Sequence, residues 1–340
     1  MANISPDPIF QMLTGFWVSK TLMSAVELDI FTKLEGKQAS MKELQQMLEM
    51  ESRPAEIFAS ALLSLGLIEQ KDGRLSNSAV ASAFLNKNNP GYMGDIVRMF
   101  DERLYKGWDL LTWSLQNNKP VDAKKGGGGE SLFDDAKQNK NIDAIVKFTH
   151  AMHGVSIGPA MALVKTFDFS KCRKMMDIGG GSGVYAINVV KENPHMTATV
   201  LDLEPVCKVA QEYIDRYDLA SRIKTQPLDF FKENLPNGHD VAFLSHILHD
   251  YDKEKGIALL KKIYDSLSET GVIIVSEWML NDNRTGPVPS ALMGLNMVVE
   301  TNGGRNYSFE EIADMLKQAG FKNAEKRPLA GPAEIAIGYK

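Results

Sequence analysis

Cysteine is scarce in this chain of 340 residues, which holds only Cys172 and Cys207. Two cysteines cannot build a disulfide framework, and their spacing is not that of a metal site. A chain without disulfides suits a reducing compartment, so we expect a cytoplasmic protein. The N-terminal residues MANISPDPIFQM lack the basic and apolar segments of a secretory signal. No apolar run approaches the ~20 residues of a membrane-spanning helix, so we expect no membrane partner.

Positive charge is not in excess either, because 38 Lys and Arg stand against 43 Asp and Glu, a net charge of −5 at pH 7. Binding of DNA or RNA needs clustered basic residues, so no nucleic acid partner is expected. The content of 44% hydrophobic and 24% charged residues is that of an ordinary globular chain, which excludes a largely disordered one. The length is enough for two to three domains at ~100–200 residues each.

The first hundred residues predict a small helical module. Apolar residues at helical spacing predict three helices, over 9–34, 40–49 and 53–65. The turn Asp72-Gly73 predicts a hairpin within 65–78. Three helices and a hairpin form a winged-helix pattern, but the third helix offers only Arg53 as a cation. We therefore expect residues 1–100 to pack or dimerise, with a DNA-binding regulator as the open alternative.

Residues 101–165 predict a helical linker that contributes to a substrate pocket. It is interrupted over 121–135, where four consecutive glycines predict a loop. From 172 onward the pattern changes to alternating strands and helices. Strands are expected at 174–179, 196–203, 224–228, 241–245, 272–277 and 333–339, and helices at 252–268 and 309–319 among others. Such alternation predicts an α/β domain over 166–340, with a mainly parallel sheet and helices on both faces.

A glycine-rich loop follows the first of these strands and opens a helix. Its sequence, Asp177 to Gly183, is DIGGGSG, and Asp202 ends the next strand. Free N–H groups at the helix start and a carboxylate for ribose hydroxyls are typical of a nucleotide site. The segment from Gly181 to Ala186 also fits the G-x-G-x-x-A dinucleotide pattern, which leaves an NAD-dependent oxidoreductase open. The carboxylate of Asp177 would repel a pyrophosphate but suits a sulfonium, which favours S-adenosylmethionine.

Six motifs together resemble those of class I S-adenosylmethionine-dependent small-molecule O-methyltransferases, the group of the plant caffeate and the hydroxyindole enzymes. They are DIGGGSG (177–183), LDLEP (201–205), LDFF (228–231), LHDYDKEK (248–255), VSEWML (275–280) and NGGRNYSFEE (302–311). The resemblance covers nearly the whole chain. It implies a winged-helix dimerisation domain, a homodimer, and a Rossmann-like domain of seven strands whose final strand is antiparallel. It also implies that the methyl donor leaves as S-adenosylhomocysteine.

The resemblance assigns cofactor binding to two glycines, to acids after two strands and to their neighbours. With Asp177, the predicted set is Gly179, Gly181, Asp202, Asp229, Phe230 and Ser245. Asp202 would hold the ribose, and Asp229 and Phe230 would flank the adenine. Ser245 stands where the plant enzymes often have Lys or Arg.

For catalysis, a positioned histidine can take the proton of a phenol, whose pKa is about 10. The resemblance implies that His249 is this base and that Glu277 is its partner acid. We interpret His246 as structural and Asp250 as the cap of the helix over 252–268. Asn306 stands where the plant enzymes have a second acid, which implies a dyad with one acid or a different acceptor chemistry.

The acceptor pocket would be apolar and polarizable, which suits a planar aromatic ring. The predicted lining is Met152, His153, Met293, Asn296 and Met297. His150 and His153 lie one helical turn apart without a third ligand, so no metal is expected. These residues predict methyl transfer to the hydroxyl of a small phenolic acceptor. Methylation of N or C, and a related non-methylating chemistry with the same cofactor, stay open.

Overall fold

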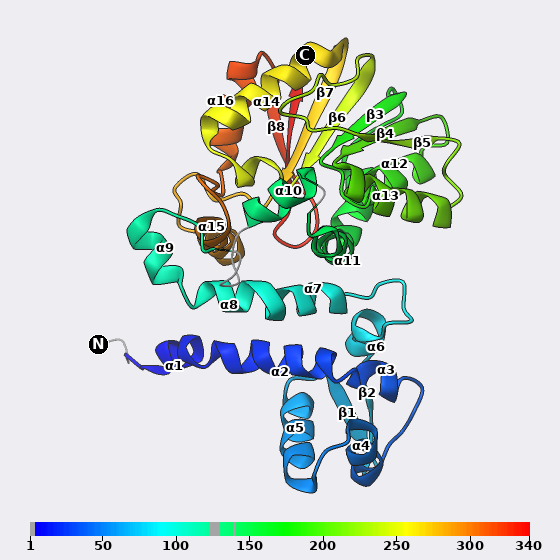
Figure 1. Cartoon of the computed structure of the whole chain (residues 1–340), viewed down its shortest axis with the longest axis vertical. Helices are drawn as coiled ribbons and strands as arrows, with labels where there is room; N and C mark the ends of the chain where they lie inside the picture. The colour runs from blue at the N-terminus through cyan, green and yellow to red at the C-terminus, as the bar shows by residue number, and fades with distance from the viewer. Residues whose placement is uncertain (1–3, 123–128, 139) are drawn as a thin grey trace. The chain divides into compact units, whose positions relative to one another are not determined.

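The computed structural model describes residues 4–122, 129–138 and 140–340, and the fold divides after Glu102 into two units (Figure 1). The first unit holds nine of the elements labelled there. They are α1 (Asp7–Leu13), α2 (Gly15–Glu27), α3 (Ile30–Leu34), α4 (Met41–Leu48), α5 (Ser52–Ser64), β1 (Ile68–Lys71), β2 (Arg74–Asn77), α6 (Ala79–Leu85) and α7 (Gly94–Met99). A π-helical turn, Phe100–Leu104, follows α7.

Three helices occupy the segment 9–34 in place of the single helix expected there. The break before α3 falls at Asp29, whose φ of 57° is in the left-handed region that a continuous helix cannot accommodate. The hairpin is as predicted, since β1 and β2 pair antiparallel across Asp72-Gly73. A capping box formed by Ser40 and Glu43 begins α4, as the sequence pattern indicates.

Apolar side chains of α3, α4, α5 and the hairpin form the core of this unit, with Phe31, Leu44, Leu62 and Leu75 at most 1% exposed. Helix α1 and the first half of α2 differ, because most of their large apolar side chains face solvent. Those at least half exposed are Ile9, Phe10, Met12, Leu13, Phe16, Trp17 and Val18. A patch of this kind marks an interaction surface more often than a free face.

The second unit begins with helices α8 (Tyr105–Trp108), α9 (Leu111–Asn117), α10 (Gly129–Lys137) and α11 (Ile142–Thr166). The expected loop over 121–135 falls partly outside the described residues, at 123–128. Its last part was predicted wrongly, because α10 is a helix from Gly129 onward. Leu132 and Ala136 lie one turn apart and are both buried, so packing of an amphipathic face outweighs the breaking effect of the preceding glycines.

Seven strands form the sheet of the second unit, in the order β5-β4-β3-β6-β7-β9-β8. Their bounds are β3 (Lys174–Ile178), β4 (Thr197–Asp202), β5 (Ile223–Pro227), β6 (His239–Ser245), β7 (Leu267–Glu277), β8 (Lys322–Pro328) and β9 (Glu334–Tyr339). Neighbours from β5 to β7 pair in parallel, and β9 pairs antiparallel with both β7 and β8. The predicted sheet with an antiparallel final strand is confirmed.

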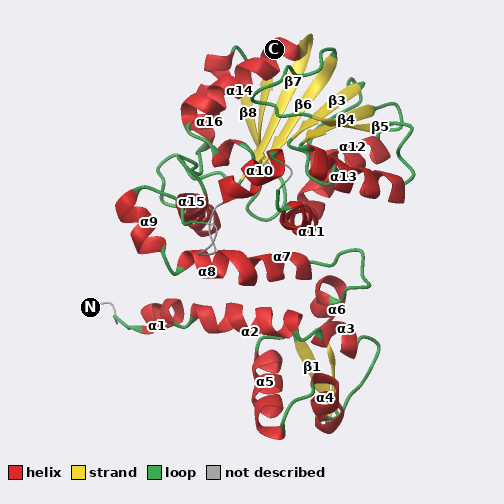
Figure 2. Ribbon diagram, viewed as in Figure 1, coloured by secondary structure: helices red, strands yellow, loops and turns green. Residues whose placement is uncertain are grey.

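Helices cover both faces of this sheet (Figure 2). Helices α11, α12 (Val184–Glu192) and α13 (Glu204–Arg216) pack on one face, where Met175, Val241 and Phe243 are buried. Helices α14 (Lys253–Ser266) and α16 (Phe309–Ala319) pack on the other, over Met176 and Leu244. Helix α15 (Val288–Glu300) precedes α16. Within the described ranges, no helix has the length and apolar content needed to cross a membrane.

Candidate functional site

The glycine loop between β3 and α12 adopts a backbone that glycine tolerates best. Gly179, Gly181 and Gly183 have φ values of 64°, 57° and 72°. The N–H of Gly179 donates to the carbonyl of Leu201 at the end of β4, at 2.8 Å. A Cβ on Gly179 would collide with the side chain of Ile247. Both the positive φ and the close packing of Ile247 therefore favour glycine at position 179.

Asp202 reaches from the end of β4 to this loop. Its Oδ2 accepts the N–H of Gly181 at 2.9 Å, and its Oδ1 accepts the N–H of Leu203 at 2.7 Å. Burial raises the pKa of Asp202 to about 6, against the lowering effect of these two hydrogen bonds. The acid and the loop thus meet at the carboxyl ends of neighbouring strands, as the sequence pattern indicates.

Asp177 is buried within β3, with 1% of its surface exposed. Its Oδ2 accepts the N–H of Ala186 in α12 at 3.4 Å, and a Cβ on Gly180 would lie 2.8 Å from its Cγ. Burial raises the pKa of Asp177 to about 7, against this hydrogen bond. The carboxyl therefore lies directly against the loop at Gly180 and connects β3 to the first turn of α12.

The other predicted cofactor residues lie at the same edge of the sheet. The ring of Phe230 would stand 3.7 Å from a Cβ on Gly179. Asp229 binds its own segment, since its Oδ1 accepts the N–H of Phe231 at 3.1 Å. Ser245, at the end of β6, donates to the hydroxyl of Tyr185 at 3.1 Å. Phe230 thus borders the loop directly, whereas Asp229 and Ser245 make contacts with their protein neighbours.

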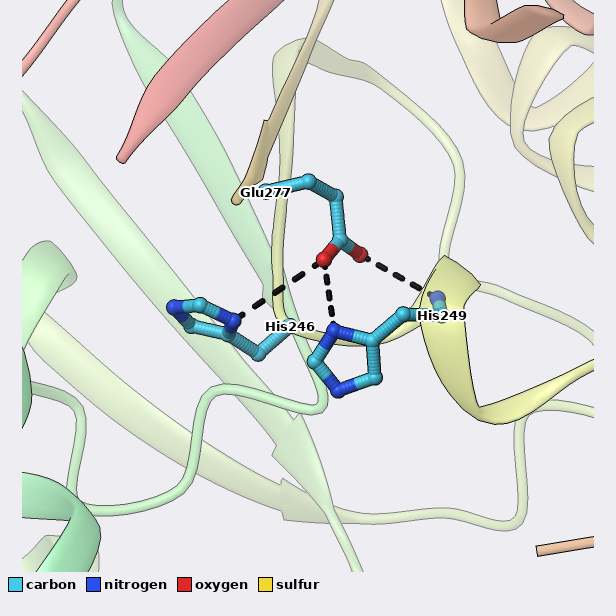
Figure 3. Close-up of side chains that lie close together, drawn as sticks. All are labelled: His246, His249 and Glu277. Atoms are coloured by element: carbon cyan, nitrogen blue, oxygen red, sulfur yellow. Dashed lines mark hydrogen bonds and ion pairs between the residues drawn. The ribbon is translucent and has the colours of Figure 1, made fainter. Parts of the chain in front are cut away.

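His249 and Glu277 form a buried polar pair at this edge, with side chains 6% and 4% exposed. Oε2 of Glu277, the last residue of β7, lies 2.7 Å from Nδ1 of His249 in the short helix Leu248–Asp250 (Figure 3). Its other oxygen, Oε1, accepts the main-chain N–H groups of residues 247, 248 and 249 at 3.0–3.3 Å. One carboxylate therefore holds both the turn and the imidazole.

The charges of this pair stabilise each other. Burial alone would lower the pKa of His249, but the negative charges of Glu277 and Asp250, with the Glu277 hydrogen bond, raise it to about 9. Burial would raise the pKa of Glu277, and the charge and hydrogen bond of His249 reverse this and lower it. The ligand-free pair is an imidazolium beside a carboxylate at neutral pH.

His246 lies on the other side of Glu277, with its Nδ1 3.8 Å from Oε2 (Figure 3). Its φ of 56° is left-handed and follows the end of β6, where the main-chain N–H bonds to the carbonyl of Ser276 at 3.0 Å. Burial lowers the pKa of His246 to about 4, against the charge of Glu277. This histidine is therefore neutral beside a charged one.

Asp250 does not cap the following helix, which corrects the expectation from the sequence. Asp252 is the cap, because its Oδ1 accepts the N–H of Lys255 at 2.8 Å. Asp250 instead has its Oδ1 3.5 Å from Nε2 of His249. Burial raises the pKa of Asp250 to about 6, opposed by the charge of His249. Sequence reasoning missed this second carboxylate because a helix start two residues away offered a simpler role.

Asn306 lies in the loop before α16 and bonds to main chain through its side-chain amide. It is 2% exposed, and its Nδ2 donates to the carbonyl of Trp278 at 2.7 Å. In the same loop the N–H of Arg305 donates to the carbonyl of His249 at 2.8 Å. The loop thus holds the backbone of His249, while Glu277 and Asp250 provide the carboxylates around its ring.

The predicted acceptor residues lie on two helices, α11 and α15. His153 in α11 belongs with the glycine loop, because its Nδ1 lies 2.7 Å from Oγ of Ser182 and its ring stacks on Tyr213 at 3.8 Å. Asn296 in α15 accepts the indole N–H of Trp108 at 3.0 Å. Among the methionines, Met297 is 4% exposed and packs in the interior. Met152 and Met293 are both partly exposed.

Two charged residues near α15 gave no signal in the sequence. Arg103 and Glu300 form a partly buried ion pair, and the guanidinium of Arg103 lies 5.7 Å from the ring centroid of Phe148. Their charges also act on the pKa of Asp250. A single arginine in a helical segment of the sequence predicts a solvated side chain. Only the structure shows that this pair acts on Asp250, next to His249.

Comparison with known proteins agrees with this arrangement. A family model described as an O-methyltransferase domain matches residues 108–322, and one described as an O-methyltransferase dimerisation domain matches residues 10–87. The chain is 35% identical over 332 residues to the 3-hydroxy-5-methyl-1-naphthoate 3-O-methyltransferase of Streptomyces sahachiroi, covering 98% of this chain and 94% of that protein. It is 32% identical to the tetracenomycin polyketide synthesis 8-O-methyl transferase TcmO of Streptomyces glaucescens, covering 98% and 97%.

The fold matches as well. The crystal structure of human N-acetylserotonin methyltransferase in complex with S-adenosylmethionine superposes with a TM-score of 0.90 at 24% identity, covering 100% of this chain and 99% of that one. The resemblance inferred from the six motifs is confirmed, and the dehydrogenase and DNA-binding alternatives gain no support. Because the catalytic-domain model spans more than half of the chain, the protein belongs to the O-methyltransferase family.

Proposed function

We propose that the protein transfers the methyl group of S-adenosylmethionine to a hydroxyl of a small aromatic acceptor, with His249 as general base. The observation that carries this proposal is the buried hydrogen bond of 2.7 Å between His249 and Glu277 at the edge of the sheet that also holds the glycine loop. The aromatic acceptor is suggested by the naphthoate and polyketide named for the two relatives.

The residues present fit the proposed donor. The left-handed glycines leave open main chain where a ligand can approach, and Asp202 presents a carboxylate at the rim of the loop. Phe230 borders the same loop and offers a flat apolar face for a purine. When bound, S-adenosylmethionine supplies a methyl group already activated by a sulfonium charge. The protein's task is therefore to place the acceptor hydroxyl and to remove its proton.

His249 is suited to that proton transfer. The base is the neutral form of the ring, in which Glu277 holds the N–H of Nδ1 and Nε2 is the atom left to accept a proton. The pKa of His249, about 9, lies close to the ~10 of a phenol, so the proton moves with little free-energy difference as the O–C bond forms. The carboxylate of Glu277 then stabilises the imidazolium. In sum, the acceptor loses a proton to His249 and gains the methyl group.

We also propose that the protein acts as a homodimer assembled through α1 and α2. The exposed apolar side chains of these two helices lie at the start of the region that matches the dimerisation-domain model. Burying them against a second copy would remove from water the largest run of apolar side chains exposed on this unit.

The proposed function is tested with calorimetric binding of S-adenosylmethionine and with labelled methyl transfer to a panel of hydroxylated naphthoates and phenols. The variant His249→Ala should lose roughly 10²-fold or more of turnover while its affinity for S-adenosylmethionine changes by less than about twofold. The matched control His195→Ala, at an exposed histidine outside the site, should keep normal turnover. Unchanged turnover in His249→Ala would remove the base from the proposal.

A further inference from the structure

Three side chains of metal-binding types, one of them the proposed base, converge at one point. The nitrogen or oxygen atoms that His246, His249 and Glu277 offer all lie within 4.8 Å of one another (Figure 3). Methyl transfer as proposed above uses His249 and Glu277 but gives His246 no task. Among the described residues, Nδ1 of His246 has no hydrogen-bond partner although it is buried. A buried ring nitrogen without a partner is costly, which calls for an explanation.

We propose that His246, His249 and Glu277 form a zinc site and that a zinc ion bound there reversibly switches the enzyme off. The inhibitory part rests on the proposed role of His249 as base. The site itself does not, because it follows from the three side chains alone.

The ligand set is one that zinc prefers. Two imidazole nitrogens, one carboxylate oxygen and a water make the open tetrahedral site of many zinc enzymes. Magnesium and calcium prefer oxygen ligands throughout, so they are not expected here. At Zn–N and Zn–O lengths of about 2.0–2.2 Å, the ligand atoms of a tetrahedral site stand roughly 3.3–3.5 Å apart. The observed separations from Oε2 of Glu277 are 2.7 Å to Nδ1 of His249 and 3.8 Å to Nδ1 of His246, so both lie within about 1 Å of the tetrahedral value. All three ligand atoms lie within 4.8 Å of one another, so small rotations of the side chains suffice to close the site.

The three side chains are also held in place before any ion arrives. Oε1 of Glu277 accepts three main-chain N–H groups, which turns Oε2 toward both imidazoles. The left-handed backbone of His246 brings its ring to the same oxygen. The three side chains are 11%, 6% and 4% exposed, so an ion there is shielded from bulk water. Such ordering reduces the entropy lost when the ion binds.

Occupation of the site would disable the base by a simple proton count. The ion takes the electron pair of Nδ1 of His249, and the proton that was on Nδ1 leaves to solvent. The remaining proton of the neutral ring stays on Nε2, so Nε2 has no free electron pair to accept the acceptor's proton. The carboxylate of Glu277, bound to the ion, no longer stabilises an imidazolium. Turnover should therefore stop while the donor site stays intact.

Binding is tested first, on the untagged full chain without donor or acceptor. Zinc chloride titrated calorimetrically should bind once per chain, and cobalt chloride should give the intense visible absorption of a tetrahedral site. His246→Gln should weaken zinc binding roughly tenfold or more. The matched control His195→Gln should leave it within about twofold, as should the double variant Cys172→Ser and Cys207→Ser.

Activity is tested second, as the ratio of turnover with zinc to turnover with a chelator. One equivalent of zinc should abolish wild-type turnover, the chelator should restore it, and His246→Gln should need at least about tenfold more zinc for the same loss. Absence of binding and of the cobalt spectrum overturns the site, as does binding lost only in the cysteine variant. Undiminished turnover at full occupancy overturns the switch. Should His246→Gln not fold, the wild-type cobalt spectrum still decides about the site.

Discussion

At the scale of single residues, Glu277 holds two different groups through its two carboxylate oxygens. Oε1 accepts hydrogen bonds from three main-chain N–H groups of the turn, and Oε2 accepts one from Nδ1 of His249. Hydrogen bonds to a charged acceptor are among the strong ones in proteins, so this carboxylate resists protonation and displacement. The protonation state of His249 therefore depends on one acid whose position is fixed by the backbone around it.

The first prediction concerns the pH profile of kcat/KM. Because the ligand-free base has a pKa of about 9, kcat/KM should rise with pH and level off near that value. In Glu277→Gln the raising charge is gone while burial still lowers the pKa of His249, so the midpoint should move below about pH 8. The plateau should also fall by roughly tenfold or more, since the imidazolium loses its partner.

This profile should be measured with an acceptor whose hydroxyl pKa exceeds about 10, so that its own ionisation stays outside the window. Glu334→Gln is the matched control, because Glu334 pairs with Glu277 across β7 and β9 but makes no contact with His249. An acid limb that stays near pH 9 in Glu277→Gln would contradict the assignment.

A second prediction concerns stability and the buried Asp177. Its pKa of about 7 in the folded chain lies above the ordinary value of 3.8, so the folded state holds its proton more tightly than the unfolded state. This destabilises the fold increasingly as pH rises from about 4 to 7. Asp177→Asn should therefore raise the free energy of unfolding by about 1–3 kcal/mol at pH 8 and bring no gain near pH 4.

Urea unfolding at both pH values checks this prediction. Asp168→Asn is the control, and it should lower the free energy of unfolding at pH 8 instead of raising it. The reason is that the hydrogen bond from the N–H of Ser170 lowers the pKa of that exposed carboxylate. Equal changes for Asp177→Asn at pH 4 and pH 8 would mean that its charge does not oppose folding.

At the scale of elements, the strands that carry the site are readable from the sequence. Strands β3, β4, β6 and β7 contain mostly buried apolar runs followed by polar or glycine residues, which is the usual signal of a parallel sheet. Strand β8, with sequence KNAEKRP, was not expected because its residues are mostly exposed and charged, as suits an edge. The juxtaposition of Asp250 with Nε2 of His249 also escaped prediction, because it depends on side-chain packing and not on spacing.

The loop before α16 gives a third prediction. A Cβ on Gly304 would lie 2.6 Å from the carbonyl oxygen of His249 and 3.0 Å from the carbonyl carbon of Asp250. These are backbone atoms that cannot move without moving the base, so Gly304→Ala should lower turnover at least tenfold and cost about 1–3 kcal/mol of stability.

Gly294→Ala is the matched control for this change. Gly294 lies inside α15, and a Cβ there meets Asn306 only at ordinary contact distances of 3.9–4.0 Å. Alanine in a helix interior stabilises by about 0.5–1 kcal/mol relative to glycine. Turnover and thermal unfolding should be measured for both variants. Equal turnover in Gly304→Ala and Gly294→Ala would show that the loop does not position His249.

At the scale of the whole molecule, the exposed helices α1 and α2 give a fourth prediction. Phe10 and Trp17 are 59% and 61% exposed. Replacing both by Asp should place charges in the proposed dimer interface and shift the protein from dimer to monomer at micromolar concentration. Light scattering after size-exclusion chromatography measures the mass.

Ile57→Asp provides the comparison, because Ile57 on α5 is 58% exposed but lies outside the patch on α1 and α2. This variant should remain dimeric. A wild-type chain that is monomeric, or a double variant that stays dimeric with native helical content, would contradict an interface on these helices.

When the chain refolds, the contact between His249 and Glu277 depends on the pairing of β6 with β7. Ser245 pairs with Ser276, and this register brings His249 to Glu277 although 28 residues separate them. A slip of one residue would turn Glu277 to the opposite face of the sheet. Parallel strands form late, because the intervening chain must be ordered first. Methyl transfer should therefore return only after the circular dichroism of the helices has recovered. The time course of regained activity then reports when the central strands of the sheet have paired.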